Sequence, residues 1–179
     1  MDLFLVIWMA VLFPLLHILN GWVFQFAEIS PHIALVYLPA FLRLANVLIL
    51  GRVHGTAATL LGGMLLMRYF DENSWVGLLN TICSAAGPLL ALSLFRWHAA
   101  RPVNLTSLKD LTWLTLVYAA ANAMLHHAMW SLLDPSVLVA PVQIFQMILG
   151  DIAGALLGAY CMKWCIVGYR RRKLGDDLN

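Results

Sequence analysis

Charged residues are scarce in this chain of 179 residues: only 11% are Asp, Glu, Lys or Arg, whereas 62% are hydrophobic. A soluble domain of this length cannot bury so much apolar surface, so the composition excludes an ordinary soluble protein and indicates a membrane protein. Short loops leave no room for a separate soluble domain. We therefore expect an all-α, polytopic membrane helical bundle.

Motifs of catalysis are lacking as well. The sequence contains no phosphate-binding loop and no H-E-x-x-H motif, and Asp151 is the only carboxylate within the apolar segments. Cys83, Cys161 and Cys165 all fall within predicted helices, where a buried thiol is usually a small hydrophobic residue. A channel would need polar groups through the whole bilayer, and one half of the bundle is predicted to be dry. We expect a protein that is not an enzyme, not a channel and not a nucleic-acid-binding protein.

Six apolar segments approach or reach the roughly 20 residues that a helix needs to cross a bilayer. We predict spans over residues 3–24, 31–51, 54–70, 76–97, 111–133 and 139–169. Residues 1–169 would form one transmembrane bundle, and residues 170–179 a basic and then acidic tail. The first segment lacks the basic start and the cleavage site of a signal peptide, so we expect it to be a retained helix. Ser107, three residues before Asp110, predicts a capped start for the fifth helix.

Lys and Arg fall mainly on one side of this arrangement. With six crossings both termini share a side, and every Lys and Arg except Arg43 and Arg68 falls there: Arg52, Arg96, Arg101, Lys109, Lys163, Arg170, Arg171, Arg172 and Lys173. The positive-inside rule makes this side cytoplasmic. We predict a multi-pass protein with both termini in the cytoplasm and a basic collar against the anionic headgroups of the lipid bilayer.

Two opposite charges interrupt the apolar segments at matched depth. Arg43 and Asp151 are predicted about 18 Å below the outer boundary, at about 1.5 Å of helix rise per residue. An unpaired charge at the bilayer centre costs at least about 2.5–3.5 kcal/mol. We therefore predict an ion pair between Arg43 and Asp151, with Asn122 and Asn46 close to it. The pair would be either part of a binding site or a structural clamp between two helices.

More polar residues gather in the outer half of the predicted bundle, namely His17, Asn20, Asn80, Asn122, His126, His127, Gln143 and Gln146. We predict a polar cavity that opens outward, with the charged pair as its floor and with Arg43, Asp151, Asn122, His126, Asn46 and Gln146 as ligand-binding residues. Breaks in the helix are tolerated beside a cavity. We predict one such break at Pro39 and a second at Pro88.

His17 and His126 leave open a different chemistry. Both are predicted at similar depth, and two imidazoles from separate membrane helices can ligate haem iron or another metal. No C-x-x-C-H haem attachment motif accompanies them. His17 and His126 could therefore be ligands of haem. The simpler alternative is that they bind no metal.

The small residues of the last segment predict close packing. Gly150, Gly154 and Gly158 recur at every fourth position, which lets a neighbouring helix approach closely.

Four stretches of the sequence, in this order, resemble the membrane-associated sensor domain (MASE family, first type) of bacterial signalling proteins: "VYLPAFLRLANVLILGRVHGTAATLLGGMLL", "NTICSAAGPLLALSLFR", "LKDLTWLTLVYAAANAML" and "QMILGDIAGALLGAY". Gly150, Asp151 and Gly154 match the G-D-x-x-G core of the family's late helix, whereas Met147 or Phe145 replaces its usual aromatic residue. The resemblance covers residues 30–160. It implies a sensor module of the bacterial inner membrane. Family members have about eight spans and a cytoplasmic output, so this shorter chain would signal through a separate partner.

The residues and the resemblance leave several functions open. The first is a sensor or small-ligand-binding module whose ligand enters from the outer side and whose signal passes to another membrane or cytoplasmic protein. The second is a structural or accessory subunit of a larger membrane complex, or the substrate-capturing component of a transporter. The third is haem or metal binding through His17 and His126. A second copy of the chain is a further candidate partner.

Overall fold

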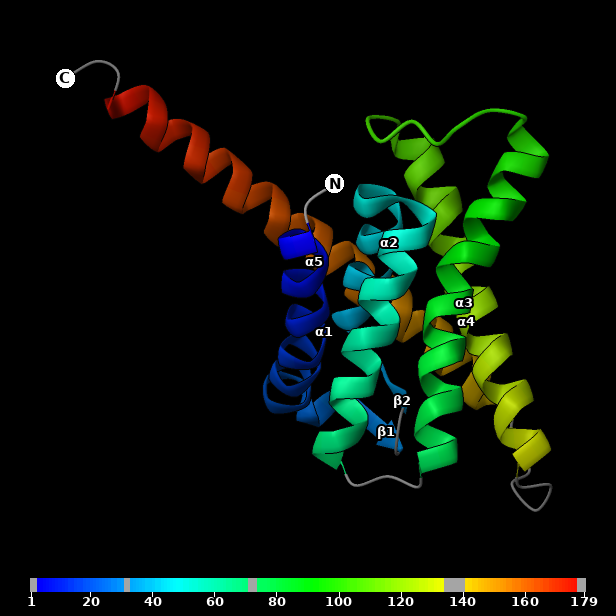
Figure 1. Cartoon of the computed structure of the whole chain (residues 1–179). Helices are drawn as coiled ribbons and strands as arrows, with labels where there is room; N and C mark the ends of the chain where they lie inside the picture. The colour runs from blue at the N-terminus through cyan, green and yellow to red at the C-terminus, as the bar shows by residue number, and fades with distance from the viewer. Residues whose placement is uncertain (1–2, 31–32, 71–73, 134–140, 177–179) are drawn as a thin grey trace.

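The computed structural model describes residues 3–30, 33–70, 74–133 and 141–176. Within these ranges the chain is almost wholly helical. Its elements follow the order α1 (Leu3–Val23), η1 (Gln25–Ala27), β1 (Glu28–Ser30), β2 (Ile33–Ala34), α2 (Pro39–Phe70), α3 (Ser74–Ala99), α4 (Leu108–Leu133) and α5 (Pro141–Asp176). The helices form one bundle, and the β1–β2 pair lies at one end of it (Figure 1). The expected helical class is confirmed.

Four of the described helical stretches are long and apolar enough to cross a membrane: Leu3–Val23, Pro39–Met67, Trp75–Ala99 and Pro141–Cys165. This is the composition of a multi-pass membrane protein. α4 is not among these four, because Asn122, His126 and His127 lower its mean hydropathy. The predicted count of six crossings is therefore not confirmed.

α2 reverses direction at Gly51 and so joins two of the predicted segments. Gly51 has φ 79° and ψ 174°, a backbone conformation that is essentially restricted to glycine. The side-chain amide of Asn46 donates a 3.1 Å hydrogen bond to Thr59 Oγ1 across the reversal. In a straight helix these two residues would be separated by about 20 Å. The two arms of α2 therefore lie against each other, and the turn between them lies near the α2 label in Figure 1.

The helix predicted from residue 31 begins later than expected. β2 pairs antiparallel with β1, and the chain stays non-helical up to Leu38. Pro39 is the first residue of α2, where its fixed φ and missing N–H are favourable. The predicted break at Pro39 is thus wrong, because this proline starts a helix. The predicted break at Pro88 is wrong as well, because Pro88 lies inside α3, which continues through it.

Backbone groups of this non-helical segment bond to α1 and α5. The Asn20 amide donates to the Val36 carbonyl at 3.1 Å and accepts from the Leu38 N–H at 2.8 Å. The Tyr37 N–H donates to the Gly150 carbonyl at 3.1 Å. Asn20 is itself buried. These bonds satisfy main-chain groups that would be costly to leave unpaired inside the bundle.

The glycine-spaced face of α5 accommodates the same segment. A Cβ atom on Gly150 would overlap the carbonyl oxygen of Ala34, and one on Gly154 would overlap the carbonyl oxygen of Tyr37. The close approach predicted from the glycine spacing is therefore present. Its partner at these two positions is an extended backbone and not a second helix.

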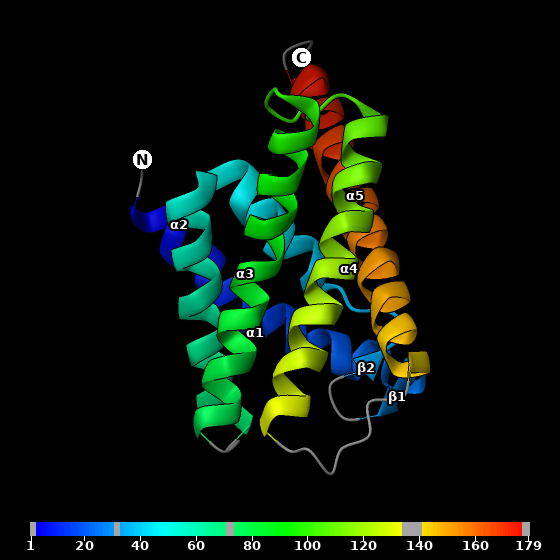
Figure 2. The same ribbon diagram turned by 90° about the vertical axis from the view of Figure 1, so that its right-hand side faces the viewer.

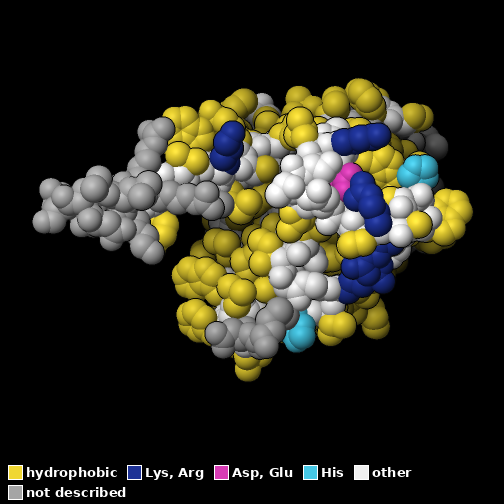
Figure 3. All heavy atoms as spheres, turned by 90° about the horizontal axis from the view of Figure 1, so that it is seen from above, with side chains coloured by type: hydrophobic (Ala, Val, Ile, Leu, Met, Phe, Trp, Pro, Cys, Tyr) yellow, Lys and Arg dark blue, Asp and Glu magenta, His cyan; other side chains and the backbone are white. Residues whose placement is uncertain are grey.

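Basic side chains gather at the end of the bundle opposite the β1–β2 pair. Arg52 follows the reversal of α2, Arg96 lies near the end of α3, and Lys109 lies at the start of α4; all three are exposed. Figure 3, which views the molecule from above, shows Lys and Arg side chains grouped on this face. The beginning of α1 and the end of α5 also point toward this end (Figure 1).

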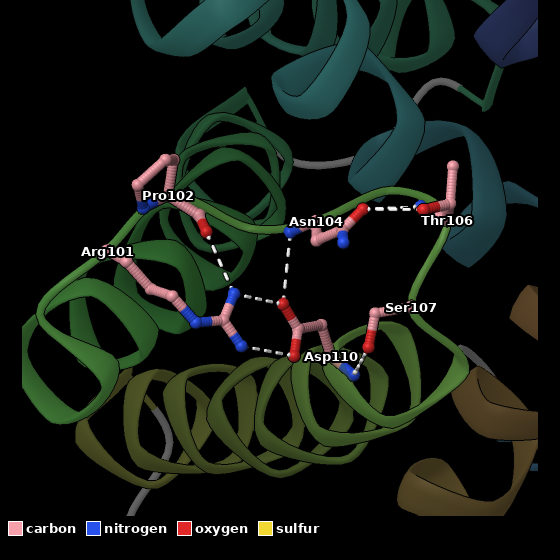
Figure 4. A network of polar contacts seen from close by, with 6 residues as sticks. All are labelled: Arg101, Pro102, Asn104, Thr106, Ser107 and Asp110. Carbon is pink, nitrogen blue, oxygen red and sulfur yellow. Dashed lines mark hydrogen bonds and ion pairs between the residues drawn. The ribbon is translucent and has the colours of Figure 1, made fainter.

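The loop between α3 and α4 is fastened by Arg101 and Asp110 (Figure 4). Arg101 Nη2 donates to Asp110 Oδ1 at 2.8 Å, Arg101 Nη1 pairs with the other carboxylate oxygen, and the Asn104 N–H donates to Asp110 at 3.0 Å. The hydrogen bond from Arg101, and then that from Asn104, hold the pKa of Asp110 below its usual range. Ser107 Oγ accepts from the Asp110 N–H at 3.3 Å, as expected for a helix cap.

α5 crosses the bundle obliquely and continues beyond it (Figure 1), and it runs beside α4 in Figure 2. Its helical backbone extends to Asp176, so most of the predicted tail over residues 170–179 belongs to this helix. Tyr160, Trp164 and Tyr169, in the part that leaves the bundle, are exposed.

Candidate functional site

Arg43 and Asp151 are linked through Asn122. Asn122 Nδ2 donates to Asp151 Oδ2 at 2.7 Å, and Asn122 Oδ1 accepts from Arg43 Nη1 at 3.5 Å. All three side chains are buried, and they come from α4, α5 and α2. The predicted direct ion pair is wrong, since the amide of Asn122 lies between the two charged groups. An amide can take this place because it both donates and accepts hydrogen bonds.

The guanidinium of Arg43 packs against two aromatic rings. Its carbon is 5.3 Å from the ring centroid of Phe13 and 4.9 Å from that of Tyr37, distances at which a cation is attracted to an aromatic face. Arg43 Nη2 also donates to the Tyr37 hydroxyl at 2.9 Å. A guanidinium carries five N–H donors. Printed hydrogen bonds aside, the geometry engages only Nη1 and Nη2, and the buried Tyr118 hydroxyl lies near the guanidinium, so the group keeps donor capacity beyond its bonds to Tyr37 and Asn122.

Asp151 keeps unused acceptor capacity in the same way. Its side chain is 1% exposed and lies on the cavity wall. Among the described residues its one hydrogen-bond donor is Asn122, which bonds to a single carboxylate oxygen. A carboxylate can accept at both oxygens. The second oxygen of Asp151 is therefore available to another donor.

Tyr37 connects Arg43 to His17. The Tyr37 hydroxyl oxygen and His17 Nδ1 are 3.0 Å apart. Because a guanidinium can only donate, the tyrosine oxygen accepts from Arg43 and its own hydrogen is left for His17 Nδ1. Sequence reasoning missed Tyr37, although the proline two residues later was a signal. Residues directly before a proline disfavour helix, so a bend in the chain was to be expected here.

His126 is held by two neighbours. Its Nδ1 lies 2.9 Å from the Asn122 carbonyl oxygen, which can only accept, so this nitrogen carries the proton in the neutral ring. Its Nε2 lies 3.4 Å from Ser84 Oγ. The ring packs edge-on against Trp130, whose indole N–H donates to Asn80 at 2.9 Å. These contacts join α3 and α4 beside the charged residues.

A cavity of about 310 Å³ lies between these groups, near the lower end of the range for ligand pockets. Residues of all five α-helices and of the β1–β2 region line it. Its polar and charged lining residues are His17, Asn20, Glu28, Tyr37, Arg43, Asn80, Thr81, Ser84, His126 and Asp151, and its larger apolar ones are Phe13, Phe24, Ile33, Leu66, Met67, Trp130 and Met147. A cavity lined by the polar groups named above together with a larger apolar surface is therefore present in the described structure.

In the described structure, three of the six predicted ligand-binding residues do not line the cavity: Asn46, Asn122 and Gln146. Asn46 is fully buried and bonds to Thr59 within α2, and Gln146 is not among the described residues that line the cavity. The side chain of Asn46 does not reach the cavity, because the reversal of α2 at Gly51 brings Thr59 next to it as a hydrogen-bond partner. Arg43, Asp151 and His126 line the cavity, whereas Asn122 links the two charged side chains without lining it.

The described structure places no further metal-ligating side chains beside His17 and His126 that would complete a metal site. Both histidines line the cavity. In the described ranges no group of three or more His, Cys, Asp or Glu side chains is placed to hold a metal ion. Nδ1 of His17 and both ring nitrogens of His126 lie close to protein groups.

The fold and the cavity define the class of the protein: a helical bundle with the composition of a multi-pass membrane protein and a cavity among its helices that holds both charged and apolar side chains. Comparison of the chain with protein-family models, curated proteins and solved structures finds no match.

Proposed function

We propose that this protein is a non-enzymatic membrane module that binds a small polar molecule in the cavity between its helices. The observation that carries the proposal is the pair of buried charges on one cavity wall, each with unused hydrogen-bonding capacity. Ionisable groups inside a membrane bundle are costly and are generally kept for a function. A clamp that served only stability would use their hydrogen bonds more fully.

The ligand would enter from the outer side of the membrane. The exposed basic residues Arg52, Arg96 and Lys109 gather at the end opposite the β1–β2 pair, and basic loops are typical of the cytoplasmic side. The cavity includes Glu28 of β1 and Asn80 in the first half of α3, so it lies toward the other end. In this proposal the chain crosses the bacterial inner membrane six times. The two arms of α2 count as separate crossings.

A sensory role follows from the resemblance to the membrane-associated sensor domains. The G-D-x-x-G stretch that carries the resemblance contains Asp151, which lines the cavity, and Gly150, which bonds to the chain at Tyr37. Occupation of the cavity would act directly on α5. A separate membrane or cytoplasmic protein, or a second copy of the chain, would receive the signal.

The exposed part of α5 favours a second candidate function, that of an accessory or substrate-capturing subunit of a larger membrane complex. Tyr160 is 57% exposed and Trp164 is 65% exposed where the helix leaves the bundle. Aromatic side chains are enriched at protein interfaces. Purification of a stable complex with a transporter would support this alternative, whereas a regulatory partner would support the sensor.

Native mass spectrometry of the purified chain in lipid nanodiscs tests ligand binding. We expect the wild-type protein to carry a small molecule. Ser84→Phe, which fills the cavity, should lose that molecule. The matched control Ser93→Phe places the same side chain on the exposed surface of the same helix and should retain it. An empty wild-type protein, or equal retention by both variants, contradicts the proposal.

A further inference from the structure

The charges of the cavity wall define the charge of its occupant. Arg43 supplies one positive charge and Asp151 one negative charge, and the amide of Asn122 keeps them from neutralising each other by direct contact. An occupant with net charge would leave one charge uncompensated in a buried site, which is costly. An occupant that carries one charge of each sign compensates both.

Hydrogen-bonding capacity indicates the same kind of molecule. Arg43 has five N–H donors and makes two side-chain hydrogen bonds, to Asn122 and Tyr37, and a guanidinium forms its strongest bonds with a planar carboxylate. The available oxygen of Asp151 requires a donor, such as an ammonium group. The two unsatisfied groups lie one amide apart, on either side of Asn122. A molecule with a carboxylate and an ammonium group close together would satisfy both.

The remaining walls fit a compact, partly apolar molecule. A volume of about 310 Å³ excludes a large ligand, and Phe13, Leu66, Met67 and Met147 offer apolar surface to a short side chain. Exposed Glu28, at the β1–β2 end, adds a negative charge on the entry side. This charge disfavours anions that lack a compensating ammonium group.

We propose that the cavity binds a small zwitterion of the amino-acid type, with its carboxylate on Arg43 and its ammonium group on Asp151. The inference rests on the proposed function, since it names the class of ligand that the same cavity takes. It assigns separate roles to the two charged residues. Arg43 recognises the anionic end of the ligand, and Asp151 selects against molecules that lack the cationic end.

Titration calorimetry with three matched probes tests the inference on the full chain in nanodiscs. The probes are free leucine, 4-methylpentanoate, which lacks the amine, and 3-methylbutylamine, which lacks the carboxylate; glutamine and glycine, each with its deaminated and decarboxylated counterparts, extend the set. We expect at least one amino acid to bind at least tenfold more tightly than both of its single-charge counterparts. Equal binding of an amino acid and its deaminated counterpart overturns the inference, as does the absence of binding by every amino acid.

Asp151→Asn separates recognition from a structural role. The variant keeps the shape of the side chain, so we expect the preference for amino acid over deaminated acid to fall from at least tenfold to about onefold. Asp110→Asn, in the loop clamp outside the cavity, should leave that preference unchanged. A preference that survives Asp151→Asn overturns the assigned role. If native mass spectrometry then finds a ligand of another class, the cavity still binds a small molecule and only the zwitterion inference fails.

Discussion

The side-chain amide of Asn122 donates a 2.7 Å hydrogen bond to the carboxylate of Asp151, and both groups are almost completely buried. This contact is shorter than the 3.5 Å bond between Asn122 and Arg43. Hydrogen bonds to a charged acceptor are both shorter and stronger than neutral ones. Asn122 is therefore the direct hydrogen-bond partner of Asp151, whereas the positive charge of Arg43 acts on the carboxylate without a direct bond.

Asn122→Ala should destabilise the protein, because it leaves the buried carboxylate of Asp151 without its donor. A buried group that loses its partner costs about 1–3 kcal/mol, and more when the group is charged. Thermal unfolding in detergent, followed by circular dichroism, measures the effect. The control Asn104→Ala changes an exposed loop residue and should shift the midpoint much less. Equal shifts would mean that the Asn122–Asp151 bond contributes little.

Double-mutant cycles should rank the two contacts of Asn122. We expect coupling of about 1 kcal/mol or more between Asn122→Ala and Asp151→Asn, because residues in one hydrogen-bonded network are not additive. The cycle of Arg43→Gln with Asp151→Asn should give a smaller coupling, since no direct bond joins these side chains. A larger coupling in the second cycle would instead support the direct ion pair between Arg43 and Asp151 that was predicted from the sequence.

Gly51→Ala should destabilise the reversal of α2. Its φ of 79° and ψ of 174° fall in a region that costs a non-glycine residue about 1–3 kcal/mol. Gly21→Ala is the matched control, because a Cβ there meets no atom within 4 Å and alanine is the better helix former. Thermal midpoints of the two variants should shift in opposite directions. A neutral Gly51→Ala would show that the reversal tolerates another backbone conformation.

Gly154→Val should displace the chain at Tyr37 from α5, because even a Cβ at this position overlaps the Tyr37 carbonyl oxygen. We expect both lower thermal stability and weaker ligand binding, since Tyr37 holds Arg43. Ala159→Val, on the exposed face of the same helix, controls for the effect of valine on helix propensity. Unchanged ligand binding in a folded Gly154→Val protein would separate the cavity from the glycine-spaced face of α5.

The Arg101–Asp110 clamp should respond to acid. Its hydrogen bonds lower the pKa of Asp110 in the folded protein relative to the unfolded chain. The contribution to stability is therefore complete above the unfolded value of 3.8 and is lost as pH falls below it toward the folded value. Thermal midpoints measured from about pH 6 to pH 2.5 should fall more steeply for wild type than for Asp110→Asn. Parallel curves would contradict a linkage through Asp110.

The sequence located the two buried charges and Asn122 because apolar periodicity and helix rise place residues at predictable depths. It did not predict that Asn122 lies between Arg43 and Asp151, because depth alone does not specify which side chains face each other. The predicted helix from residue 31 failed for another reason: the hydropathy of residues 33–38 suits a helix, but the glycine-spaced face of α5 and the amide of Asn20 favour an extended chain. Such tertiary contacts outweigh local propensity.

Asp151 and Trp164 belong to one unbroken helix, α5, although the first lines the cavity and the second is exposed beyond the bundle. They are separated by about 20 Å along the helix axis. If a molecule in the cavity tilted this rod by about 5°, its far aromatic side chain would swing by about 2 Å at this axial distance. A small tilt of α5 at the cavity would therefore move the exposed side chain of Trp164 by about the width of an atom.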